Sequence, residues 1–410
     1  MSIGLLQEPL KLSPIGNPVP IVVSSSNSTT AGFRYRVDLI NDSGDDELAV
    51  WIYPDTNNGH YGIYDFSRVL SDLIGSNPEH WGTDTCIVDT EQILSYNYRV
   101  TEYINATSGA TLSGSTDFNV FRGVKQYGDY WDIETYLPNT TGDPALFASI
   151  SQKREYKLTE TATINTFEGS FGTISSEWDT IVINVFTSSY VTPYQIQKAA
   201  PSGGEVVILP LGPKNINDMA ATGVVLNMIG GGTGVVDLGP IIDTDTIKYD
   251  FYLESKGIIV TEKLIVNVDN SCYKHDGVEF LWLGELGTFE SYTFRMADLK
   301  SFKTARNEVK SNHYSIKSNQ YTYSIGDRGR TNINVSTTES HSAISGWIGD
   351  VESQDIMELI SSPEVYIKKG GEIYPIIIKN TGYDLKTIRN DKLFNYTIKF
   401  EMAYEKLSNI

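Results

Sequence analysis

The chain alternates apolar and polar side chains over many short stretches. Between residues 33 and 39 every odd position is apolar, whereas the even positions hold arginine or aspartate. From residue 394 to residue 402 every even position is apolar and every odd position is polar. A period of two places alternate side chains on opposite faces of a strand, so both stretches predict β-strands with one buried face. Further apolar runs predict strands at 48–53, 181–186, 205–209, 247–253, 264–268, 278–283, 292–296, 365–368 and 373–379.

Two stretches instead follow the period of an α-helix. After Asp65, apolar residues at positions 66, 69, 70, 73 and 74 form one continuous stripe, which Gly75 and Pro78 end. Asp65 is a good N-cap residue for this helix. Asp350 is predicted to cap a second helix, which Pro363 ends. Its predicted apolar face consists of Ile356, Met357, Leu359 and Ile360.

Short strands separated by turns predict a mainly β protein, with two or three β-sandwich-like domains and a few short helices. A chain of 410 residues is also longer than the domains that a single hydrophobic core stabilises. In the middle of the chain, strands are separated by predicted turns at 201–204, 210–213 and 230–234. We expect an N-terminal arm at 1–27, a β-sandwich-like domain with one capping helix at 28–160, a middle β domain at 161–275 and a C-terminal α+β domain at 276–410. The arm is expected to be ordered only by a neighbouring molecule.

The charge balance is strongly acidic. The chain has 51 Asp and Glu residues and 32 Lys and Arg residues, a net charge of −19. This charge repels phosphate, so we expect no specific nucleic-acid binding and no binding to an anionic membrane. No window approaches 18 uncharged apolar residues, and the first 13 residues lack the basic and apolar regions of a secretory signal. The protein is therefore expected to be made in a cytoplasm and not to enter a membrane.

No catalytic motif stands out, and three weak candidates for ligand sites have simpler interpretations. The glycine-rich stretch 230–234 lacks the Gly-Lys-Ser/Thr ending of a phosphate loop and is interpreted as a turn. Cys272 and His275 have a spacing that suits a metal, but no second pair of ligands lies nearby in the sequence. Asp55 and Asn57 imitate part of a calcium loop, but a tight turn fits them better. We expect a protein that is not an enzyme and that has no cofactor and no bound metal.

Aromatic residues are numerous, with 25 Tyr, 15 Phe and 6 Trp. Most of them are expected to fill β cores, but Tyr and Trp are also enriched at protein interfaces. The candidates for contacts between subunits, or for a carbohydrate platform, are Trp282, Phe289, Tyr292, Phe294 and Trp347.

Segments at both ends of the chain resemble one family. The run from Phe33 to Asp38, the segment Trp51–Pro54 and the segment Gly62–Leu70 resemble structural proteins of tailed bacteriophages that infect Bacteroidetes, including the crAss-like phages. In the C-terminal third, Phe280–Phe294 and the pair of segments Met357–Tyr366 and Asn390–Phe400 resemble the same group.

The resemblance covers about half of the chain and not its middle section. Thr288 and Glu290 stand where the family usually has Gly and Asp. The resemblance implies a virion structural protein, without catalysis, from a tail, neck ring or baseplate. It also implies closed rings of six or twelve copies.

Two functions remain open at this point. The first is a virion protein of the tail region, made in the host cytoplasm, which forms a cyclic homo-oligomer and contacts other tail or portal-proximal proteins. The second is a tail spike or adhesin module that binds glycans at the host surface. An enzyme is a third, weaker interpretation, because no catalytic site can be named.

Overall fold

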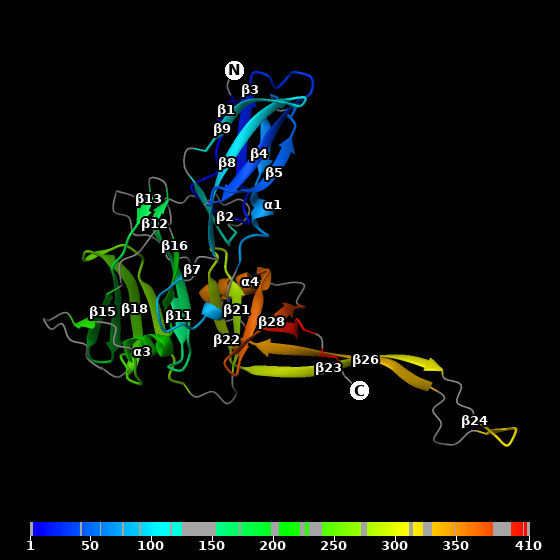
Figure 1. The fold of residues 1–410 in the computed structure, drawn as a ribbon. Coiled ribbons are helices and arrows are strands. Elements are labelled where there is room, and N and C mark those ends of the chain that lie inside the picture. The colour runs from blue at the N-terminus through cyan, green and yellow to red at the C-terminus, as the bar shows by residue number, and fades with distance from the viewer. Residues whose placement is uncertain are drawn as a thin grey trace. The chain divides into compact units, whose positions relative to one another are not determined.

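The fold is mainly β, as the sequence predicts, with a few short helices (Figure 1). The structure is a computed structural model. It describes residues 3–41, 43–57, 59–75, 78–89, 92–114, 117–124, 153–171, 174–197, 205–221, 226–228, 240–271, 277–310, 315–322, 330–348, 350–379, 395–404 and 406–407. The helices are α1 (Ser67–Leu70), a 3-10 turn η1 (Pro78–His80), α3 (Pro213–Ala221) and α4 (Asp350–Ser361).

The N-terminal part of the chain forms two sheets that share one core. One sheet has the order β1-β3-β6, and the other has the order β2-β10-β8-β4-β5, with β9 paired to β8. The strands of the first sheet are β1 (Ile3–Gln7), β3 (Pro20–Ser25) and β6 (Gly62–Asp65). The strands of the second sheet are β2 (Leu12–Pro14), β4 (Phe33–Asn41), β5 (Asp46–Ile52), β8 (Ile93–Ile104), β9 (Thr107–Ser113) and β10 (Phe118–Phe121).

The core of this sandwich follows from the alternation in the sequence. The odd residues of 33–39 are buried in one hydrophobic cluster, together with Ile21 and Val23 of β3. Residues 3–25, for which a separate arm was expected, therefore belong to the sandwich, because their apolar side chains complete its core. The predicted helix after Asp65 is shorter than expected: α1 has four residues, and turns follow it. The N-cap residue of α1 is Phe66 and not Asp65, although the Asp65 carboxylate accepts a hydrogen bond from the amide of Ser67 at 3.0 Å.

Two further sheets contain the middle of the chain. A 7-stranded sheet has the order β11-β20-β18-β14-β15-β17, with β19 paired to β18, and a 4-stranded sheet has the order β13-β12-β16-β7. β7 (Ile87–Asp89) comes from the region before residue 160, yet it pairs with β16 (Glu205–Pro210). The other strands are β11 (Lys153–Tyr156), β12 (Thr163–Phe171), β13 (Ile174–Ser176), β14 (Thr180–Thr187), β15 (Val191–Gln197), β17 (Leu226–Met228), β18 (Thr246–Ser255), β19 (Ile258–Ile259) and β20 (Leu264–Val268).

The helix α3 corrects the prediction of a plain turn at 210–213. Pro213 is the first residue of this helix, a position where the fixed φ of proline is favourable and its missing N–H costs nothing. Ile216, Met219 and Ala220 supply the buried face. Pro213 was expected in a turn between strands, whereas it is the residue at which α3 begins.

The C-terminal part is built on an 8-stranded sheet with the order β22-β21-β27-β28-β29-β26-β23, and β30 pairs with β26. Trp282, Phe400 and Ile398 belong to its core, against which Ile356 and Leu359 of α4 pack. Met357, expected on the buried face of α4, is partly exposed. The strands are β21 (Val278–Leu283), β22 (Phe289–Phe294), β23 (Ala297–Lys310), β26 (Arg330–Ile344), β27 (Val365–Lys369), β28 (Glu372–Ile378), β29 (Thr397–Met402) and β30 (Lys406–Leu407). A separate hairpin consists of β24 (Ser315–Lys317) and β25 (Gln320–Thr322).

The chain divides into two compact units. The first comprises Met1–Cys272 with Leu283–Glu290, and the second comprises Tyr273–Trp282 with Ser291–Ile410. Within the first unit, the carboxylate of Glu290 forms a buried ion pair with Arg154. Gly287 has a φ of +77°, and a Cβ there would lie 1.7 Å from the carbonyl oxygen of Arg122. The segment 283–290 is thus held in the first unit by a charge pair and by a close backbone approach.

Two buried tyrosines of the N-terminal sandwich make its stability depend on alkaline pH. Burial raises the pKa of Tyr35 and of Tyr98 to about 12, and Glu102 and Glu8, respectively, add to the effect. An unfolded tyrosine has a pKa of about 10. The native state thus holds these protons more tightly, and the resulting stability is full below pH 10 and is lost as the pH rises towards 12.

We predict that Tyr35→Phe makes the alkaline loss of stability less steep. The Tyr35 hydroxyl has no hydrogen-bond partner among the described residues, so its removal should leave stability at pH 8 unchanged or slightly higher. Urea denaturation at several pH values between 8 and 11 measures the effect. Tyr53→Phe, at an exposed tyrosine, is the matched control. Parallel curves for the two variants would show that Tyr35 does not cause the pH dependence.

Candidate assembly surface

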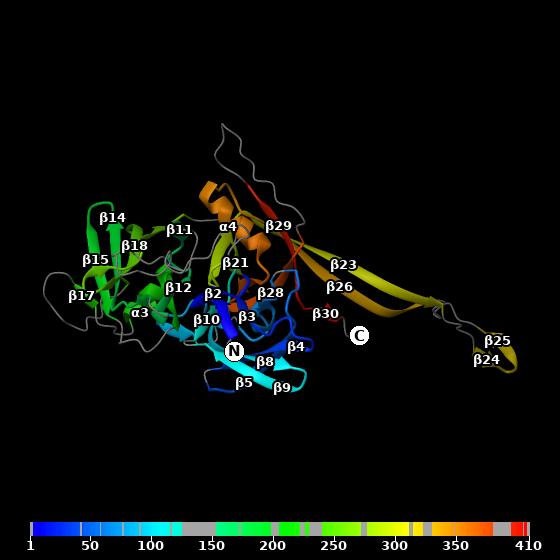
Figure 2. The ribbon, with the colours of Figure 1, turned by 90° about the horizontal axis from the view of Figure 1, so that it is seen from above.

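The most unusual element is a long two-stranded ribbon in the C-terminal unit, formed by β23 and β26. The two strands pair antiparallel from Ala297 with Ile344 to Lys310 with Arg330, and one register shift lies next to Asn307. Figure 1 and Figure 2 show the two strands side by side, extending away from β21 and β28. We call β23 and β26 together the ribbon.

The ribbon is exposed on both faces. Every residue from Leu299 to Lys310 is exposed, including Phe302, whose exposed fraction is 65%. On β26, Ile333 is likewise 69% exposed. An isolated pair of strands is at best marginally stable in water, since it has no face to bury. The described part of this pair beyond β29 therefore has exposed apolar side chains and no core of its own.

The root of the ribbon is fixed on the sheet. β26 pairs with β29 from Ser340 to Ile344, and the ring of buried His341 stacks on Phe400 at 4.9 Å. Next to the paired residues His341 and Phe400, the ammonium group of Lys379 lies 2.7 Å from the carboxylate of Glu401. The hydrogen bond from Lys379 lowers the pKa of Glu401, and the Ser340 hydroxyl donates a second bond that acts in the same direction.

A hollow of about 340 Å³ lies at this root. Its wall carries the side chains of Lys300, Lys379 and Lys399 beside three serines. The basic side chains give it the character of an anion contact, but apart from buried His341 and Phe400 its lining consists of exposed or half-buried residues. We therefore regard the hollow as part of the ribbon's root and not as a separate ligand site.

One edge of the ribbon is open. β23 is the last strand of its sheet, so no described strand pairs with its second edge. Unpaired backbone N–H and C=O groups on a long edge are a template for pairing with another chain. The ribbon region, 297–344, also differs in charge from the rest of the protein. It contains seven Lys and Arg and four Asp and Glu residues, a net charge of +3 in a chain of net charge −19.

The five aromatic residues predicted as interface candidates are not gathered in one place. Trp282, Phe289 and Phe294 are buried, and Tyr292 is half-buried against the core of the C-terminal unit. Trp347 differs from them, because 68% of its side chain is exposed. The structure thus leaves Trp347 as the one member of the set with a largely accessible ring.

Sequence patterns missed the ribbon. Its strands carry polar residues on both faces, so the apolar alternation that reveals half-buried strands is absent. A signal was nevertheless present, because 331–342 contains three threonines, one isoleucine and one valine and lacks glycine and proline. This composition favours an extended strand even without a buried face.

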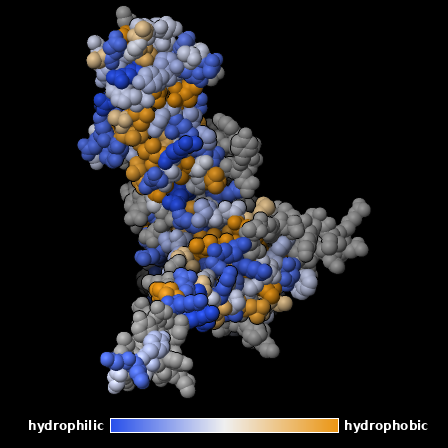
Figure 3. All heavy atoms as spheres, turned by 90° about the vertical axis from the view of Figure 1, so that its right-hand side faces the viewer, coloured by the Kyte–Doolittle hydropathy of each residue, from blue (hydrophilic) through white to orange (hydrophobic). Residues whose placement is uncertain are grey.

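A second open edge lies in the first unit, at β5. It is the last strand of its sheet, and Leu48 and Ile52 pack on the core. Trp51 points to the other face, where 41% of it is exposed. The guanidinium of Arg34 lies 3.9 Å from the centre of the Trp51 ring, and Tyr103 meets it edge-on. Figure 3, drawn from the side on which β5 lies in Figure 1, shows several groups of apolar atoms at the surface.

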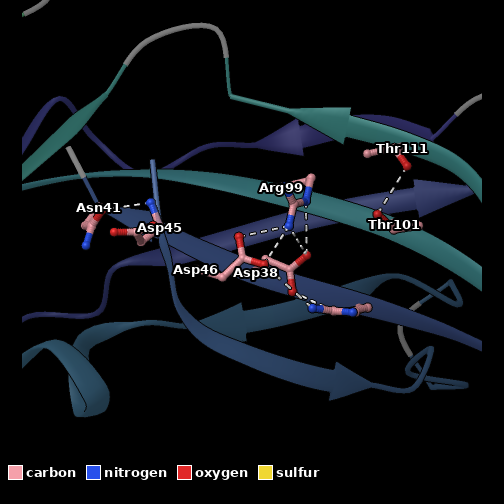
Figure 4. Close-up of polar contacts among 8 residues, drawn as sticks. Asp38, Asn41, Asp45, Asp46, Arg99, Thr101 and Thr111 are labelled. Atoms are coloured by element: carbon pink, nitrogen blue, oxygen red, sulfur yellow. Dashed lines mark hydrogen bonds and ion pairs between the residues drawn. The ribbon is translucent and has the colours of Figure 1, made fainter. Parts of the chain in front are cut away.

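An ion-pair network holds β5 to its neighbours (Figure 4). The Asp38 carboxylate, 2% exposed, accepts hydrogen bonds from the Nε atoms of Arg36 at 2.6 Å and Arg99 at 3.1 Å. Arg99 also donates two bonds to Asp46, at 2.8 and 2.9 Å. Because Asp38 lies on β4, Arg99 on β8 and Asp46 on β5, the network ties three strands together. The open edge of β5 is therefore held in a fixed geometry.

The weak candidates for ligand sites gain no support. Among the described residues, no group of three or more His, Cys, Asp or Glu could hold a metal ion. The Asp55 carboxylate accepts a hydrogen bond from the backbone amide of Asn57 at 2.9 Å, as in a tight turn. Cys272, His275 and the stretch 230–234 lie outside the described residues. In the same part of the chain, no helix has the length and apolar character needed to cross a membrane.

We predict that Asp38→Asn destabilises the N-terminal sandwich. The change leaves two arginines without their shared buried carboxylate, and hydrogen bonds to charged groups contribute about 1.5–3 kcal/mol each. Since the arginines are about one-third exposed, we expect a loss of about 1–3 kcal/mol in the free energy of unfolding. Urea denaturation at pH 7 measures it. Asp45→Asn, at an exposed neighbour, should change little, and equal stability of both variants would contradict the role of Asp38.

Comparison with known proteins gives no family for this chain. No protein-family model matches it, and no curated protein matches it.

Proposed function

We propose that this protein is a structural subunit that assembles with copies of itself, and that the ribbon is its joining element. The observation that carries the proposal is the exposure of the ribbon: Leu299, Phe302 and Ile333 are each more than 60% exposed on a strand pair that has no core of its own. Contact with a neighbouring subunit would cover these side chains and pair the open edge of β23.

We further propose that the assembly is a ring in the tail, neck or baseplate of a tailed bacteriophage. The support for this finer proposal is the resemblance of the segments near Phe33, Phe280 and Met357 to structural proteins of phages that infect Bacteroidetes. Other tail or portal-proximal proteins would then be additional partners. The strongly acidic composition is compatible with a channel lining that does not hold DNA tightly.

Mass photometry of the full chain and of a ribbon-truncated variant tests the proposal. Phe302 pairs directly with Glu339, so residues 303–338 can be replaced by Asn-Gly, a sequence that favours a two-residue hairpin turn. Those removed residues whose exposure the structure describes are exposed or half-buried, so the variant should keep the thermal midpoint of the full chain. We predict that the full chain forms a multiple of six copies and that the truncated variant is monomeric.

The outcomes separate the alternatives. A truncated variant that assembles as the full chain does would show that the ribbon is not the joining element. A full chain that stays monomeric at its highest soluble concentration would contradict assembly by this protein alone. Three copies per particle would favour a spike over a ring.

Binding of host-surface glycans is the second candidate function, and exposed Trp347 favours it. An exposed indole ring offers a flat apolar face on which a sugar ring can stack. If this function holds, soluble host glycan raises the thermal midpoint of the full chain, and Trp347→Ala abolishes the shift. Tyr404→Ala, at another exposed aromatic residue, is the control. No shift with the unmodified chain would exclude Trp347 as a glycan platform for the glycans tested.

A further inference from the structure

We propose that the open edge of β23 in one copy pairs antiparallel with the open edge of β5 in a second copy, so that the two sheets become continuous across the subunit contact. This inference rests on the proposed function, because it names the partner and the surface that the ribbon meets. The partner is another copy of this chain, and the contact joins two different edges.

Both edges have backbone groups available for such a contact. β5 pairs on one side with β4, and β23 pairs on one side with β26, while no described strand pairs with their other sides. β23 is also long enough to pair with the whole of β5, because β23 has fourteen residues and β5 has seven. Pairing would satisfy N–H and C=O groups on both strands that otherwise depend on water.

The exposed side chains match in one antiparallel register. If Trp51 lies opposite Phe302, then Ala49 lies opposite Thr304, because residue numbers increase along one antiparallel strand as they decrease along the other. Ala49 and Trp51 are both exposed, as are Thr304 and Phe302. The pair of aromatic rings would then cover each other, which is among the more stabilising cross-strand pairs. Arg34 and Tyr103 of the same copy contact the Trp51 ring and fix its orientation.

Charge supports the same register. Asp46 at the start of β5 is already paired with Arg99, whereas its neighbour Glu47 is exposed and has no cationic partner among the described residues. In the register above, Glu47 lies directly opposite Arg306. Opposite charges facing each other across strands are favourable, whereas like charges are not.

The basic residues of β23 also argue against parallel pairing in register with a second β23. In that register, Lys300, Lys303, Arg306 and Lys310 would face the same residues of the other ribbon. Lysine on an edge strand is a common device against unspecific pairing, and an acidic partner edge removes that penalty. At the level of the chain, the ribbon region carries +3 and the remainder carries −22, which follows from the total of −19. Another copy of the chain is therefore an electrostatically suitable partner.

Because each copy offers both edges, the contact can repeat from copy to copy. A contact between two different surfaces generates a closed ring when its rotation closes. This geometry agrees with the ring in the proposed function, while the edge contact itself does not depend on the number of copies.

Cysteine cross-linking between two differently tagged full-length chains tests the inference. One chain carries Ala49→Cys, and the other carries Thr304→Cys. Both also carry Cys86→Ser and Cys272→Ser, so that no native thiol competes. Residues directly opposite each other across antiparallel strands have Cβ atoms about 4.5–5.5 Å apart. Mild oxidation of the mixture should therefore give a covalent dimer that carries both tags.

Ala305→Cys is the matched control for the partner chain. Ala305 is exposed and adjacent to Thr304, but its side chain points to the opposite face of β23. We expect a several-fold lower yield with this variant, and a similar loss when Arg306→Glu is added to the Thr304→Cys chain. Adding salt should also lower the yield, since charges at the surface are screened.

Each outcome decides between the claims. Assembly of the cysteine chains, seen by mass photometry, without a cross-link between positions 49 and 304 overturns the edge contact and leaves the ribbon as the joining element. An equal or higher yield with Ala305→Cys overturns the register and with it the inference. If the chains do not assemble at all, both the edge contact and the proposed function fail.

Discussion

Every strand in this protein has two edges of backbone hydrogen-bonding groups, and the structure depends on how these groups are satisfied. In the interior of a sheet a neighbouring strand on each side pairs them. At β5 and β23 the described chain supplies one neighbour only. Water can solvate such an edge, so the fold tolerates it. The same groups remain available for pairing, and this makes the edge strands the part of the fold from which an assembly surface can be inferred.

The ribbon shows how a two-stranded element persists without a core of its own. Its stability must come from the root, where His341 stacks on Phe400 and β26 pairs with β29. Beyond the root, long antiparallel pairing with Ser, Thr and Asn side chains keeps the strands extended, because these residues are compatible with both faces in water. Hydrophobic residues such as Phe302 stand out against this background, since they bring no stability to the isolated ribbon.

Much of the sheet structure could be predicted from sequence, but the assembly surface could not. Alternation identified β4 and β29, whose buried side chains are those of the apolar positions together with Asp38 of β4. It failed for β23 and β26, because a strand exposed on both faces has no period of two in hydrophobicity. The prediction of aromatic interface residues failed for a related reason. Composition shows that Trp282 and Trp347 are large and apolar, but only packing shows that Trp282 fills a core and Trp347 lies at the surface. The helix α3 was missed because Pro213 was interpreted as ending structure, although proline is also favourable at the first position of a helix.

The features that hide the ribbon from sequence analysis are those that an assembly element needs. A ribbon with a strongly apolar face would aggregate before it met its partner, whereas a polar ribbon with a few apolar residues remains soluble. In the proposed contact, its basic residues would favour a partner edge that carries a carboxylate such as Glu47. The network of Asp38, Arg99 and Asp46 holds β5 to β4 and β8. A rigid edge loses little conformational entropy on pairing, so even a modest number of backbone hydrogen bonds and one aromatic pair can produce a specific contact.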